Sequence, residues 1–477
     1  MSRRISSNSF LHLTVSATAL ACITALAEPA LAQPQKIGAP PESSNMRLVG
    51  HNDLQARSAY QPVLHQQGSR WIAYVGHHGG KSRNPLTGRD EDNGTSIVDV
   101  TDPRNPRTLA HIPGEPGQGE TGGAQMVRVC NGKDLPKGDP AKVYLLRTYG
   151  NLAHEVWDVT APEQPARLVV VVDKLKGTHK NWWECDSGIA YLVSGLPEWR
   201  TRRMTQVFDL SDPAKPVLVR NFGLVGQQPG SSGPSPTELH GPISTGPKGN
   251  RVYFGYGTNK SGVVQIVDRA KLLAGPHEPT PQNLLLPEIG ILRLPATNGA
   301  HTTLPVLGME LPEFAKDKAG GRRDFVVVVN EQILNECLEA RQMVFMVDIT
   351  DEKAPFSVAT FNVPESSGGF CARGGRFGAH SSNENQPPMY ARKFVFVSWF
   401  NAGVRAIDIR DPFHPREAGY YIPATTANTD KRCIKTDSGE RCKVAIQTNN
   451  LEVDDRGYIY IVDRANTGMH ILEFQAK

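Results

Sequence analysis

The chain has 477 residues and a formal net charge of +4, with 45 glycines and 36 prolines. A nearly balanced charge without any long Lys/Arg run argues against a nucleic-acid partner. The many Gly and Pro residues are typical of short strands joined by turns, and helical patterning is nearly absent, which predicts an all-β protein.

The N-terminus has the pattern of an export signal. Arg3 and Arg4 precede an apolar stretch, and Ala30-Leu31-Ala32 fits the small-x-small cleavage rule. We therefore expect residues 1–32 to be a signal peptide and residues 33–45 to be a flexible, Pro-rich leader. No later run is long and apolar enough for a transmembrane segment. The expected location is the periplasm or the exterior of the cell.

One short phrase recurs along the rest of the chain, at intervals of about 50 to 80 residues, and the last copy is degraded. The copies are Val98–Pro103, Trp157–Pro162, Phe208–Pro213, Val267–Arg269, Val347–Asp351, Ile407–Pro412 and Ile471–Phe474. Repeats of this length usually stack as supersecondary units. We expect the repeated Asp to be structural, because its side chain can accept hydrogen bonds from the turn that follows.

Each unit contains three clear strands and a weaker fourth. In the fourth unit the clear strands are expected from His240, at Arg251–Gly255 and at Val263–Asp268. The last unit ends after its third strand, so we expect Met46–Val49 to supply its outer strand and close the ring. These features predict one seven-bladed β-propeller over residues 46–477.

The phrase Asp-[Ile/Val/Leu]-[Thr/Ser]-Asp-Pro-x-x-Pro resembles the LVIVD repeat of bacterial surface and exported proteins. The resemblance covers residues 46–477, although the fourth and seventh copies lack the Asp-Pro turn. It implies a propeller and little chemistry, because much of that family is functionally uncharacterised.

A second pattern lies at the expected openings of the inner strands. Their first residues are His51, Ala124, His179, His240, His301, His380 and Asn449. Histidines at this register would converge at one mouth of the channel, and imidazole is a ligand for zinc, copper and iron. We expect a transition-metal site formed by these five histidines, and His77-His78 is a weaker addition to it.

Three glutamates, Glu238, Glu331 and Glu384, lie near the histidines in sequence or on the same expected face. We expect Glu238 and Glu331 to be catalytic acid–base groups beside the metal. Long loops on the histidine side, including Glu331–Gln342 and Ile422–Gln447, suggest a walled pocket. Carotenoid-cleaving oxygenases and methanethiol oxidases are propellers with histidine-ligated metals, which is an analogy of architecture only.

Two functional hypotheses follow from these patterns. The first is a metal-dependent oxidoreductase, hydrolase or lyase that acts on a small molecule. The second is a non-catalytic surface module that binds a protein or glycan through its loop-rich face, in which case the histidines are packing residues inherited with the repeat.

Six cysteines remain after signal cleavage, an even number that suits an oxidising compartment. Cys433 and Cys442 lie close together in one polar loop, and we expect them to pair. For the other four, disulfides and buried thiols both remain open.

Overall fold

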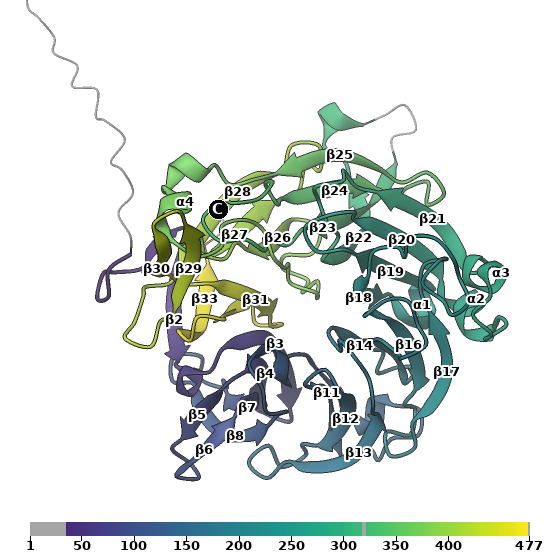
Figure 1. The fold of residues 1–477 in the computed structure, drawn as a ribbon, viewed down its shortest axis with the longest axis horizontal. Helices are drawn as coiled ribbons and strands as arrows, with labels where there is room; N and C mark the ends of the chain where they lie inside the picture. Colours follow the sequence, from purple (N-terminus) through teal and green to yellow (C-terminus); the bar gives the residue numbers. More distant parts are fainter. Residues whose placement is uncertain (1–34, 317–320, 476–477) are drawn as a thin grey trace, which may run out of the picture. The chain divides into compact units, whose positions relative to one another are not determined.

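The computed structural model describes residues 35–316 and 321–475, so the predicted signal peptide lies outside the described residues. Seven antiparallel sheets follow one another around a common axis (Figure 1). Each sheet has its first strand nearest the axis and its last strand at the rim, which is a seven-bladed β-propeller as the repeat predicts.

The strands of blades 1 to 4 follow chain order from the axis outward. Blade 1 contains β3 (Ala59–Gln67), β4 (Arg70–Gly79), β7 (Gly94–Asp99) and β8 (Arg107–Pro113), with β9 (Gly119–Ala124) paired to the end of β4. Blade 2 contains β10 (Val127–Asn131), β11 (Val143–Tyr149), β12 (Ala153–Asp158) and β13 (Ala166–Val172). Blade 3 contains β14 (Asn181–Trp183), β15 (Ile189–Ser194), β16 (Met204–Asp209) and β17 (Val217–Phe222). Blade 4 contains β18 (Leu239–Ser244), β19 (Arg251–Tyr256), β20 (Val263–Asp268) and β21 (Glu288–Arg293).

Blades 5 to 7 complete the ring, and the last two receive strands from the N-terminal segment. Blade 5 contains β22 (Thr302–Glu310), β23 (Arg322–Val329), β24 (Val344–Asp348) and β25 (Phe356–Phe361). Blade 6 contains β26 (Phe394–Ser398), β27 (Val404–Asp408), β28 (Arg416–Ile422) and β1 (Glu42–Ser44). Blade 7 contains β31 (Thr448–Val453), β32 (Tyr458–Asp463), β33 (Gly468–Phe474) and β2 (Met46–Asn52).

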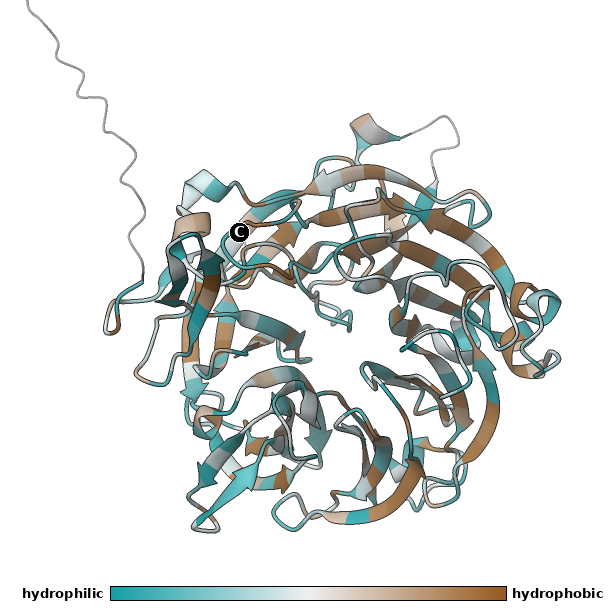
Figure 2. Ribbon diagram, viewed as in Figure 1, coloured by the Kyte–Doolittle hydropathy of each residue, from teal (hydrophilic) through white to brown (hydrophobic). Residues whose placement is uncertain are grey.

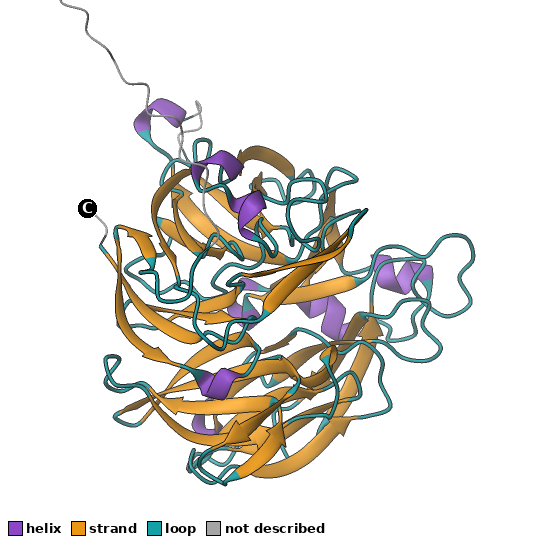
Figure 3. Ribbon diagram, turned by 60° about the vertical axis from the view of Figure 1, so that its left-hand side comes forward, coloured by secondary structure: helices purple, strands orange, loops and turns teal. Residues whose placement is uncertain are grey.

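The remaining elements are short. The helices are α1 (Gly246–Gly249), α2 (Arg269–Ala274), α3 (Pro281–Leu285) and α4 (Phe370–Arg373), and two hairpins are β5 (Lys81–Asn84) with β6 (Arg89–Asp92) and β29 (Lys431–Thr436) with β30 (Gly439–Val444). Figure 3 shows strands and loops making up nearly all of the described chain. Among the described helices, none has the length and hydropathy to cross a membrane.

Apolar runs in the middle strands form the core between blades. In β23 the segment Phe325–Val329 is wholly buried. β-Branched and aromatic side chains favour strands, and both faces of such a strand are covered because each blade packs on its two neighbours. Hydrophobic residues accordingly run along the strands of the blades (Figure 2).

The repeated Asp has the structural role expected from the sequence. Asp99, Asp158 and Asp209 each accept a hydrogen bond at Oδ1 from the backbone N–H two residues later, at 2.8–3.0 Å. This fixes the turn that leads from the third strand to the fourth in blades 1, 2 and 3.

The ring closes through the N-terminal strand, as predicted. Met46 pairs with Phe474 and Leu48 pairs with Leu472, so β2 is the outer strand of blade 7. Met46 is 4% exposed and joins the core of blades 6 and 7. Blade 7 therefore combines both ends of the described chain in one sheet.

The segment before β2 differs from the loose leader expected at 33–45. Glu42–Ser44 forms β1 and pairs with Tyr420–Ile422 of β28. Glu42 also accepts a hydrogen bond from Arg373 Nη2 at 3.0 Å. The prediction was wrong for these residues because β28 offers an open edge that three extended residues can cover.

The six described cysteines form three disulfides. The predicted Cys433–Cys442 bond links β29 to β30 and is confirmed. Cys130–Cys185 joins blade 2 to blade 3, and Cys337–Cys371 joins the loop after β23 to α4.

Candidate metal centre

Four of the five predicted histidines meet at the axis. His179, His240, His301 and His380 stand at the axial starts of the inner strands of blades 3, 4, 5 and 6. Blade 6 has an irregular inner segment at 381–383, which bonds to β26 through Ser382 and its neighbours. All four histidines are between 0% and 3% exposed, so their polar nitrogens must find partners inside the protein.

Each of the four imidazoles packs against the imidazole of the next blade. Ring centroids are 4.4 Å apart for His179 and His240, 3.7 Å for His240 and His301, and 4.4 Å for His301 and His380. Tyr60 of β3 closes the circle, because its ring lies 5.3 Å from that of His179 and 6.1 Å from that of His380. Five rings from five blades thus surround the axis.

Glu331, which follows β23, is the carboxylate that faces this circle. Its Oε2 lies 3.9 Å from Nε2 of His240 and 3.9 Å from Nε2 of His301, and its Oε1 lies 3.6 Å from Nε2 of His380. These distances are too long for hydrogen bonds. Three imidazole nitrogens therefore point toward one carboxylate without bonding to it.

The hydrogen bond of His380 sets its tautomer. Its Nδ1 lies 2.6 Å from the carbonyl oxygen of Asn449, and a carbonyl can only accept, so Nδ1 carries the proton. The lone pair is then on Nε2, which faces Glu331. A backbone carbonyl on the far nitrogen is the usual way in which a protein orients a metal-binding histidine.

Other nitrogens of the cluster lack partners among the described residues. They are Nδ1 of His179, Nδ1 of His240 and Nε2 of His301. Nε2 of His179 lies within 3.0 Å of the Tyr60 hydroxyl and 2.8 Å of Nε2 of His240. One ring nitrogen offers either a proton or a lone pair, so these two contacts compete.

Burial controls the charge of the cluster. It lowers the pKa of His179, His240, His301 and His380 well below the usual value, so they are neutral imidazoles at neutral pH. Burial raises the pKa of Glu331, and the Arg376 guanidinium, bonded to it at 3.1 Å, opposes that rise. A neutral imidazole is the protonation state that metal binding requires of histidine.

The donor set fits a transition metal. The ligand atoms of His240, His301 and Glu331 all lie within 4.8 Å of one another, and His380 approaches from the next blade. Tetrahedral Zn–N bonds of about 2.1 Å would place ligand atoms roughly 3.4 Å apart, so small side-chain movements suffice. Nitrogen ligands with one carboxylate suit zinc, copper or iron.

Small residues let the strand openings approach each other. A Cβ on Gly299 would lie 1.9 Å from the carbonyl oxygen of Thr258, so only glycine fits there. This close contact with the neighbouring loop holds the segment that carries His301 against blade 4. Glu331 is fixed from the same loop, because its N–H donates to the Thr258 oxygen at 3.0 Å.

A second layer of charged groups surrounds the circle. Arg464 Nη2 donates to Nε2 of His78 at 3.0 Å and to Glu120 at 3.0 Å. The His78 ring lies edge-on to Tyr60 at 5.0 Å, and burial lowers its pKa to about 4. His78 thus adjoins the cluster, whereas His77 bonds to Ser96 inside blade 1.

Three predicted site residues, His51, Glu238 and Glu384, lie away from the histidine cluster. His51 is exposed on β2, stacks on His470 and bonds to the Thr467 oxygen at 2.7 Å. The true inner strand of blade 1 begins at Ala59, because β2 continues to Asn52 as a rim strand. Glu238 bonds to Arg202 at 2.6 Å and is partly exposed.

Glu384 lies farther along the axis than the histidines. It binds Lys180 Nζ at 2.6 Å and also contacts Arg128. With both oxygens held by cations it does not face the imidazoles. Conversely, sequence reasoning missed Tyr60, Asn449 and Arg376, of which only Asn449 stands at a recognised strand opening.

No protein-family model matches the chain, and no curated protein matches it. Solved structures that resemble it include Sqt1 from Chaetomium thermophilum (10% identity, TM-score 0.47, covering 91% of this chain and 99% of that one). Kuenenia stuttgartiensis hydrazine synthase (11%, 0.48, 90% and 98%) and the Dos1 propeller (11%, 0.46, 90% and 96%) are others. Likenesses this distant carry no inference about chemistry.

Proposed function

We propose that this chain is an exported propeller of the LVIVD-repeat kind, and that its histidine cluster binds a transition metal and transforms a small molecule. The observation that carries the proposal is the convergence of three Nε2 atoms on one buried carboxylate, at 3.6–3.9 Å. The export pattern of residues 1–32 and three disulfides support an oxidising compartment.

A zinc, copper or iron ion held there would act as a Lewis acid or would lower the pKa of a bound water. The residues of the chain supply the rest. Glu331 is an acid–base group held by Arg376, and the Asn449 carbonyl keeps His380 in its metal-binding tautomer. Tyr60 offers a hydroxyl within 3.0 Å of His179 and can donate a proton at that nitrogen.

The reaction class stays open among oxidation, hydrolysis and elimination. The competing function is a non-catalytic binding module in which the histidines only pack the axis. The close packing of His240 on His301, with ring centroids 3.7 Å apart, favours that alternative, because neutral imidazoles in contact also fill space well.

Elemental analysis of protein purified from its native compartment tests the proposal. We expect about one equivalent of zinc, copper or iron per chain. Less than about a tenth of an equivalent, unchanged after incubation with each metal and removal of the excess, would contradict it.

The variants His240→Ala, His301→Ala and His380→Ala refine the test. Each should remove most of the metal while circular dichroism stays unchanged, because strand pairing and apolar burial hold the ring. If the histidines only pack the axis, each variant should instead lose about 1–3 kcal/mol of stability with no change in metal content.

A further inference from the structure

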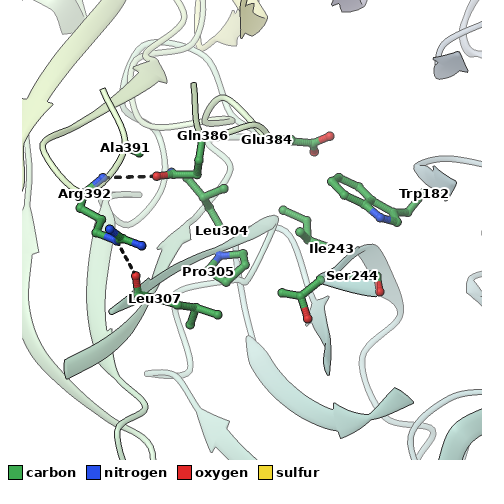
Figure 4. Close-up of a pocket in the computed structure, with 11 residues that line it drawn as sticks. Trp182, Ile243, Ser244, Leu304, Pro305, Leu307, Glu384, Gln386, Ala391 and Arg392 are labelled. Carbon is green, nitrogen blue, oxygen red and sulfur yellow. Dashed lines mark hydrogen bonds between the residues drawn. The ribbon is translucent and has the colours of Figure 1, made fainter. Parts of the chain in front are cut away.

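The four inner strands that carry the histidines also line a pocket farther along the axis. The pocket has a volume of about 360 Å³, within the range of small-molecule sites. Its lining, drawn in Figure 4, comes from blades 3 to 6 and comprises Trp182, Ile243, Ser244, Thr245, Leu304, Pro305, Leu307, Glu384, Gln386, Ala391 and Arg392.

This pocket is separate from the histidine cluster. Ile243 follows His240 by three residues and Leu304 follows His301 by three, and at about 3.3 Å per strand residue the two sites are roughly 10 Å apart. Lys180 lies between them, bonded to Thr302 on one side and to Glu384 on the other. No predicted function accounts for the pocket.

The walls of the pocket are apolar and partly flat. Ile243 and Leu304 are buried, while Trp182 is half-buried and turns its indole toward the pocket (Figure 4). The Arg128 guanidinium lies 4.8 Å from the Trp182 ring centroid and holds the indole in place. A planar apolar group would find a rigid aromatic contact there.

The polar groups of the pocket favour a negative charge. The Glu384 carboxylate pairs with both Lys180 and Arg128, which offset its negative charge. Arg392 is exposed and bonds to the Leu307 oxygen through Nε alone, which leaves its two Nη groups without a partner in the described chain. Arg392 is therefore the cation of the lining that is free to bind an anionic ligand.

Gln386 lies beside Arg392 in the lining of the pocket. Its Oε1 accepts from the Arg392 N–H, and its Nε2 has no hydrogen-bond partner among the described residues. Nε2 is enclosed by protein atoms, so Gln386 contributes to the site by holding the backbone of Arg392.

We infer that this pocket binds a small carboxylate with a flat apolar body. The body packs on Trp182, Ile243 and Leu304, and the carboxylate accepts from Arg392. Charge-assisted hydrogen bonds to a guanidinium are stronger than neutral ones, so charge dominates the selection. The inference is independent of the proposed metal site.

Three probes of one shape test this selection on the native protein. They are 3-phenylpropionate, its neutral amide and 3-phenylpropylamine, each titrated at neutral pH by calorimetry and by tryptophan fluorescence. We expect saturable binding of the acid, with the amide at least about tenfold weaker and the amine weaker still. Equal binding of acid and amide, tighter binding of the amine, or no saturation by the acid at about 10 mM would overturn the inference.

Two variants locate the binding. Arg392→Gln should erase the preference for the acid over the amide, and the surface change Arg83→Gln in blade 1 is the matched control that should preserve it. Because Arg392 is exposed, the fold should survive the change. His301→Ala should leave the affinity for the acid unchanged. A preference that survives Arg392→Gln would place the acid elsewhere and refute the site.

Discussion

The inner strands on the two sides of the ring differ sharply at the same depth. Blades 3 to 6 present four imidazoles, three of which have a ring nitrogen without a partner among the described residues. Blades 7 and 1 present amides, where Asn450 Nδ2 donates to Gln61 Oε1 at 2.6 Å and Asn449 Nδ2 donates to the Tyr60 oxygen at 3.3 Å. On one side amides join neighbouring blades through hydrogen bonds, and on the other Nε2 of His240, His301 and His380 faces Glu331.

This difference separates two uses of buried polar groups. The amide hydrogen bonds fix neighbouring blades, whereas ring nitrogens gathered around one carboxyl group form a donor set that suits a metal ion. Changes on either side of the ring test this difference. The largest effect is expected where β2 pairs with β33 and closes the ring.

Deleting residues 33–49 should destabilise the protein most. It removes β1 and most of β2, and the burial of Met46 alone is worth roughly 2–5 kcal/mol. We expect Tm to fall by roughly 5–10 °C in calorimetry. Deleting only 33–41, which precedes both strands, is the control. Equal Tm values for the two deletions would show that the N-terminal strands do not close the ring.

Asn450→Ala should cost about 1–3 kcal/mol of unfolding free energy, because Gln61 would lose its buried partner. Its metal content should equal that of the native protein. This pattern is the opposite of that expected for His301→Ala. Loss of metal in Asn450→Ala would mean that the two sides of the ring are not distinct.

His154 of β12 tests burial of a histidine away from the cluster. Burial lowers its pKa to about 4, so the unfolded chain, with a pKa near 6.5, binds more protons between these values. Stability should therefore fall as pH drops from about 6.5 to about 4, by at most about 1.4 kcal/mol per pH unit from this group. His154→Gln should show a shallower loss in denaturant titrations across that window. An identical pH slope would exclude His154 as a source.

Glu238→Gln should have the smallest effect. Glu238 is partly exposed and pairs with Arg202, and such surface pairs contribute only about 0–1 kcal/mol. Metal content should stay unchanged, whereas Glu331→Gln should lower it. If Glu238→Gln released the metal, the assignment of Glu331 as the carboxylate of the site would be wrong.

Sequence reasoning predicted the ring and its closure because the Asp phrase repeats once per blade and the last blade lacks a strand. It also predicted that four histidines converge, since a constant register along inner strands places equivalent residues at the same depth, and it placed Glu331 on the same face. It misplaced His51 because β2 continues past the closure as a rim strand, and the repeat does not fix where blade 1 then begins.

Tyr60 and Arg376 could not be found in this way. Tyr60 occupies the position expected for His51 but has a different side chain, and Arg376 lies in an irregular loop whose path no periodic pattern determines. The pocket around Trp182 depends on how side chains of four blades pack, which strand patterns do not specify.

The closure of the ring by β2 and β33 also determines when the ring can form during synthesis. The partner of β2, one of the earliest strands, is β33, whose last residue is Phe474. β2 can therefore pair only after the ribosome has added β33, and until then its edge is open to other strands. A ribosome stall or a truncation before β33 would release a ring that cannot close. Blade 7 is therefore the sheet whose completion depends on uninterrupted synthesis.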